Sequence, residues 1–144
     1  MLVYNVEIEK SIISLLLQYP KVWGEISFAI NDEDFSKVNR SVFGLLKQQL
    51  EIAPQNPSVA SVILAEKFKI YSIALDGGVD PYDYFEALRL KPVKETDALH
   101  LAQELKAVTV KRNLIEKCQD AIKSLKESST SSFEDMVGIV DKGL

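Results

Sequence analysis

The chain has 144 residues, of which 47% are apolar and 26% are charged, and its formal net charge is −4 at pH 7. This composition is typical of one soluble globular domain and excludes a disordered acidic tail. The longest apolar run, residues 12–17, is interrupted by Ser14 and is far shorter than the roughly 20 residues that a membrane span needs. The one cysteine, Cys118, cannot form a disulfide within the chain, and no secretory signal is recognisable, so we expect a reduced, cytoplasmic compartment and no membrane partner.

The charge is distributed unevenly along the chain. Residues 1–90 hold 8 basic and 12 acidic side chains, whereas residues 91–144 hold 9 of each. A domain that binds nucleic acid by itself usually carries a basic stripe that replaces counterions along the phosphates. The basic pairs at Lys67 and Lys111 are instead interrupted by apolar neighbours at helical spacing. We therefore expect weak or no direct binding to nucleic acid.

The first third of the chain is predicted to form short helices. Asn5 is a favourable N-cap, and the apolar residues after it recur at helical spacing up to Tyr19. A second short helix is expected over residues 21–30, and a third begins after a cap at Ser36 or Asn39. The aromatic residues expected in the core are Trp23, Phe35 and Phe43.

Two caps followed by proline, Asn56-Pro57 and Asp80-Pro81, each predict the start of a further helix. The glycine pair between them, Gly77-Gly78, lacks the preceding strand and the following lysine of a phosphate-binding loop, so it indicates a turn. The acidic cluster at residues 31–34 lacks the alternating ligands and central glycine of a calcium loop, and we interpret it as a turn that ends at a buried Phe35.

The segment from Thr96 to Glu127 contains no glycine or proline and predicts one helix of about 48 Å. A serine-rich turn follows, and Ser131 with Glu134 forms a capping box for a final amphipathic helix that reaches Leu144. We therefore predict an all-α protein, with a compact multi-helix head at residues 1–90, a connector at 91–95 and a protruding antiparallel helical hairpin at 96–144.

The long helix carries apolar residues over a wider arc than one partner covers. The final helix spans only about 20 Å of its length, so we expect part of the remaining surface to mediate self-association. The alternative is that the hairpin folds back over the head within one chain. The residues predicted for self-association follow a heptad seam and its neighbouring stripe: Leu101, Leu105, Val108, Arg112, Ile115, Cys118 and Ile122.

The chain contains few residues of the types that usually carry out catalysis. The single histidine, His100, and Cys118 lie 18 residues apart on the same predicted helix, or about 27 Å, so they cannot form a nucleophile–base pair within one chain. No pair of His or Cys residues has metal-ligand spacing, and no P-loop sequence occurs. We predict no catalytic residue, no metal site and no cofactor in this chain, and hence no enzymatic activity of its own.

The order of the elements resembles the N-terminal domain of hexameric replicative DNA helicases of the DnaB family. The resemblance is carried in the head by EIEKSIISLLL (residues 7–17), DFSKVNRSVF (34–43) and LDGG (75–78), followed by YFEAL (84–88). In the hairpin it is carried by AVTVKRNLI (107–115) and SFEDMV (132–137). It covers nearly the whole chain.

The sequence also departs from that family. Asn39 and Ser41 stand where members often have histidines, Ser14 stands where glycine is common, and Lys91-Pro92 replaces small polar residues. These departures indicate a divergent member, such as a phage-encoded one.

The resemblance implies a non-catalytic domain for ring assembly and for docking of primase or a helicase loader during DNA replication. It also implies that ATP and Mg²⁺ would bind in a separate ATPase domain of a full-length helicase. Two alternatives stay open: the helicase-binding domain of a primase, which has a similar helical build, and a stand-alone helical protein-interaction regulator.

Overall fold

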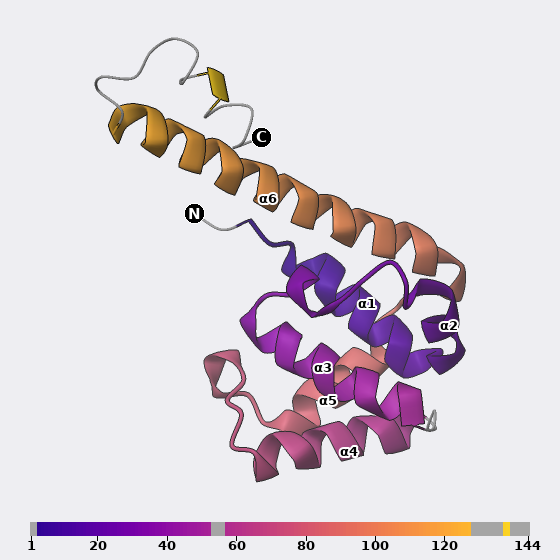
Figure 1. Cartoon of the computed structure of the whole chain (residues 1–144). Coiled ribbons are helices and arrows are strands. Elements are labelled where there is room, and N and C mark those ends of the chain that lie inside the picture. The colour runs from indigo at the N-terminus through magenta and orange to yellow at the C-terminus, as the bar shows by residue number, and fades with distance from the viewer. Residues whose placement is uncertain (1–2, 53–56, 128–136, 139–144) are drawn as a thin grey trace.

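The structure is a computed structural model that describes residues 3–52, 57–127 and 137–138, and it confirms the predicted all-α class. No strand occurs among these described residues. Five helices and short 3₁₀ turns form a head, and a long helix crosses one side of the head and extends beyond it (Figure 1). The α-helices are α1 Val6–Gln18, α2 Trp23–Ile26, α3 Lys37–Ile52, α4 Pro57–Ile70, α5 Pro81–Leu90 and α6 Ala98–Glu127. The 3₁₀ turns are η1 Pro20–Val22, η2 Asp32–Asp34, η3 Asp76–Gly78 and η4 Glu95–Asp97.

The helix ends follow the sequence signals in part. Asn5 caps α1 as predicted, because its side-chain oxygen accepts a hydrogen bond from the Ile8 amide at 3.2 Å. Asp80 precedes α5 but its side chain makes no cap hydrogen bond, and it pairs instead with Lys69 at 3.5 Å. Asn56 lies outside the described residues, although α4 begins at Pro57.

The start of α3 is fixed by an acid from another helix. Ser36 directly precedes α3, so it holds the cap position, and the Glu9 carboxylate of α1 accepts from its amide at 2.8 Å and from its hydroxyl at 2.7 Å. The same Glu9 oxygen accepts from the Asn39 side-chain amide at 3.1 Å. Glu9 is fully buried. The amino end of a helix favours negative charge, which offsets part of the cost of burying this carboxylate.

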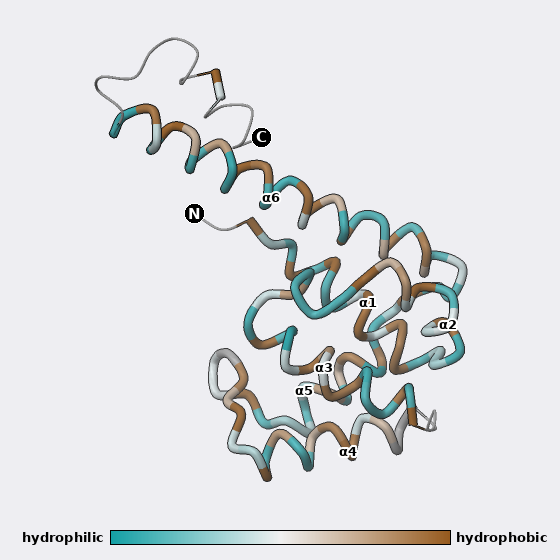
Figure 2. The backbone as a smooth tube through the Cα atoms, in the orientation of Figure 1, coloured by the Kyte–Doolittle hydropathy of each residue, from teal (hydrophilic) through white to brown (hydrophobic). Residues whose placement is uncertain are grey.

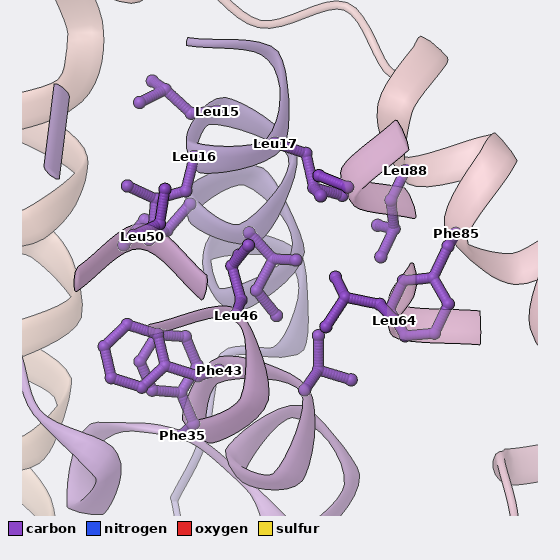
Figure 3. Close-up of a cluster of buried hydrophobic side chains, with 14 of the residues drawn as sticks. Leu15, Leu16, Leu17, Phe35, Phe43, Leu46, Leu50, Leu64, Phe85 and Leu88 are labelled. Carbon is purple, nitrogen blue, oxygen red and sulfur yellow. The ribbon is translucent and has the colours of Figure 1, made fainter. Parts of the chain in front are cut away.

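The core lies around α1, which packs against α3, α4, α5 and α6. Leucines of α1 meet side chains of α3, α4 and α5 there (Figure 3). Phe35 and Phe43 are fully buried, as predicted, and stack with ring centroids 4.3 Å apart. Trp23 is only half-buried, with its ring edge-on to Phe43 at 5.8 Å. The expectation of a buried Trp23 therefore holds only in part.

The boundary between head and hairpin at residue 96 stays a prediction, and the first turns of the long helix pack in the core of the head. The long helix begins near that point, but Ala98, Ala102 and Leu105 belong to the same core cluster as the leucines of α1. The proximal half of α6 is therefore part of the head. The predicted second arm, residues 132–144, lies outside the described residues apart from 137–138, as does the predicted capping box.

Candidate interaction surface on helix α6

One face of α6 is buried against the head by residues spaced 4, 3, 4 and 3 apart. They are Ala98, Ala102, Leu105, Thr109 and Arg112. This spacing keeps the side chains on one side of a helix, and that side packs on α1, α2 and η2. Part of the heptad seam predicted on this helix therefore packs against the head of the same chain.

Two residues predicted for self-association are buried by this packing within the chain. Leu105 is fully buried in the core cluster, and only 5% of Arg112 is exposed. Neither offers surface to a second chain in this conformation. Leu101 is half-buried against the same core cluster, and Val108 is also half-buried. A repeat of apolar residues predicts that one face of a helix is buried. It does not show whether that face packs against the same chain or against a second chain.

The rest of the helix presents a different apolar face, which we call the α6 stripe. Val110, Leu114 and Ile122 are exposed to 51%, 48% and 52%. The stripe consists of Ala107, Val110, Leu114, Ile115, Cys118 and Ile122, which line a groove of about 420 Å³ together with Lys111 and Gln119. Apolar segments recur along α6 beyond its contact with the head (Figure 2).

Three of the seven predicted self-association residues, Ile115, Cys118 and Ile122, therefore lie on the α6 stripe. Leu114 and Val110 were not among the residues predicted for self-association. The steps of four from Val110 through Leu114 and Cys118 to Ile122 are a signal that could have identified them. The heptad seam, with alternating steps of three and four residues, includes the buried Leu105 and Arg112 as well as Ile115 and Ile122 of the α6 stripe.

Charged side chains of both signs flank the α6 stripe. Lys111 lines the groove itself, and Lys123, Lys126 and Glu127 line an adjoining hollow of about 390 Å³ with Gln119 and Ile122. A partner with a matching apolar strip would complement this surface.

The other candidate groups are engaged in structural contacts. Asp34 at the end of the acidic cluster is fully buried and pairs with Lys106 at 2.9 Å, while Asp32 pairs with Lys47 at 3.0 Å. The cluster forms the 3₁₀ turn η2 and is followed by buried Phe35, as predicted. His100 is exposed and its Nε2 lies 2.7 Å from Glu104.

Within the described part of the chain, no group of three or more His, Cys, Asp or Glu side chains is arranged to hold a metal ion. None of the described helices combines the length and apolar character needed to cross a membrane.

Comparison of the chain with protein-family models, with curated proteins and with solved structures gave no match. No family is assigned to the chain on this basis.

Proposed function

We propose that this chain is a non-catalytic protein-interaction domain that assembles with copies of itself through the α6 stripe. The observation that carries the proposal is the exposure of Val110, Leu114 and Ile122 along one helix that extends beyond the head. Contiguous exposed apolar surface of this kind usually marks an interface, since each residue gains free energy when water is removed from it.

A protein partner fits this surface better than a small ligand does. Small-molecule sites are concave and converge from several elements, with a few polar groups placed to orient the ligand. Among the described residues, those that line the groove belong to α6, and the polar ones, Lys111 and Gln119, lie among apolar neighbours. A second helix laid along α6 would cover the whole stripe at once.

The specific form of the proposal is the N-terminal domain of a replicative DNA helicase of the DnaB type, acting in the cytoplasm. The order of sequence segments supports it, and a helical head followed by a long projecting helix is the architecture that the resemblance implies. In this role the domain would contribute to ring assembly, as a dimer or hexamer, and would receive primase or a helicase loader. ATP and Mg²⁺ would bind in the ATPase domain of the full-length helicase.

Two rivals differ in what adjoins the domain. The helicase-binding domain of a primase would follow a polymerase domain, whereas a helicase domain would precede a P-loop ATPase domain. A stand-alone regulator would adjoin neither. Reading the complete gene therefore separates the three.

Sedimentation equilibrium of the wild-type chain at tens of micromolar tests the assembly role. We expect a dimer or a larger ring-related oligomer, because the α6 stripe is exposed in the single chain. A strictly monomeric chain over that concentration range would contradict self-assembly.

A further inference from the structure

Arg112 is the last buried residue on the head-facing side of α6, and acceptors from three segments surround its guanidinium. One terminal nitrogen donates to the Val3 carbonyl at 2.9 Å. The other donates to the Glu33 carbonyl at 2.8 Å and to the Thr109 hydroxyl at 3.3 Å. The guanidinium carbon also lies 4.0 Å from the centre of the Tyr4 ring. Arg112 thus connects the N-terminal segment and η2 to α6.

A second buried group continues this network. The Asp34 carboxylate accepts from the Thr109 hydroxyl and from the Asn31 amide, the latter at 2.9 Å, and it pairs with Lys106 at 2.9 Å. Thr109 therefore contacts both Asp34 and Arg112. We call the set Asp34, Lys106, Thr109 and Arg112 the α6 clamp.

The α6 clamp lies where the helix leaves the head. Leu105, the last residue of α6 in the apolar core, precedes Arg112 by seven residues, or roughly 10 Å, while residues 113–127 extend for roughly another 22 Å. Without the clamp, a small tilt of α6 about Leu105 would displace the far end of the helix about three times as far as it displaces Arg112, in proportion to these lengths. Apolar packing is weakly directional, whereas the planar guanidinium fixes the orientation of its hydrogen bonds.

We propose that Arg112 is a positioning residue that fixes the direction in which residues 113–127 leave the head. The sequence placed it among the assembly contacts, but the structure encloses it within the chain. The role of this fixed direction rests on the proposed function, because the direction of residues 113–127 determines how the α6 stripe is oriented relative to the head. The positioning itself is a property of the single chain.

The chain carries a natural pair of probes for this direction. Trp23 is the only tryptophan and lies in the head, and Cys118 is the only cysteine and lies exposed beyond Arg112. An acceptor dye on Cys118 reports the distribution of its distance from Trp23 through time-resolved energy transfer. The 144-residue chain is measured at submicromolar concentration, so that self-association does not contribute to the signal. Circular dichroism checks that each variant keeps its helicity.

We expect Arg112→Met to broaden the distance distribution and shift its mean, while Lys126→Met, which removes the same charge from an exposed site on α6, leaves it unchanged. If Arg112→Met fails to fold, the distance distribution of Arg112→Lys tests the positioning role instead. Lysine keeps the charge but loses the planar fork and the stacking on Tyr4, so the distribution should still broaden. An unchanged distribution in a folded Arg112 variant would overturn the positioning role. A monomeric wild type would contradict self-assembly without affecting this result.

Discussion

At the scale of single residues, the buried Leu105 and the exposed Leu99 distinguish core from surface positions on the same helix. Leu105 is fully buried, whereas Leu99 is 46% exposed. We expect Leu105→Ala to lower the free energy of unfolding by about 3 kcal/mol, because it removes core contacts and leaves a cavity. Leu99→Ala should change it by less than about 0.5 kcal/mol. Urea denaturation measures both, and equal effects of the two substitutions would show that Leu105 does not contribute to the core as described.

Glu9 provides the second prediction at this scale. Its carboxylate accepts three hydrogen bonds at the start of α3, and its other oxygen has no partner. Glu9→Gln removes the charge at the amino end of the helix and should lower stability by about 1–2 kcal/mol. The matched change Glu7→Gln affects an exposed acid 3.7 Å from Lys91 and should have an effect below about 0.5 kcal/mol. Indistinguishable unfolding midpoints for the two variants would contradict the capping role of Glu9.

At the scale of elements, the end of α4 contains a local strain that can be relieved. Ser72 has φ 53°, in the left-handed region, and the following Ile73 amide bonds back to the Phe68 carbonyl at 3.0 Å. This is the backbone pattern of a Schellman motif, in which glycine is preferred. Ser72→Gly should therefore raise the free energy of unfolding by about 1 kcal/mol. The control Ser27→Gly, at a helical φ of −57°, should lower it slightly, and a loss of stability in Ser72→Gly would contradict this reading.

The elements also show what the sequence could reveal. The cap at Asn5 and the length of α6 depend on neighbouring residues, so local signals predicted them. The contact of Glu9 with Ser36 joins residues 27 apart through buried polar groups, which leave no periodic pattern. The α6 stripe was predicted only in part, because an apolar repeat does not state which of its residues the head will cover. Arg112 looked like a polar member of a seam between chains, whereas its hydrogen-bond partners lie within its own chain.

At the scale of the whole molecule, the net charge of −4 opposes binding to the phosphates of nucleic acid. We expect no ATP hydrolysis above the buffer rate from these 144 residues, since they contain no P-loop sequence, and only weak, salt-sensitive binding to DNA. A coupled phosphate-release assay and fluorescence anisotropy with labelled DNA check the two statements. Tight DNA binding that persists at physiological salt would favour a nucleic-acid-binding module over an assembly domain.

The central claim is that the α6 stripe joins copies of the chain, and a matched pair of charged substitutions tests it most directly. Leu114 lies on the stripe and is 48% exposed, whereas Leu99 lies on the same helix outside the stripe and is 46% exposed. Sedimentation equilibrium should show that Leu114→Asp weakens self-association at least about tenfold, because an aspartate buried in the interface costs more than about 1.4 kcal/mol. Leu99→Asp should associate like the wild type. Unchanged association of Leu114→Asp, or equal losses in both folded variants, would contradict the account.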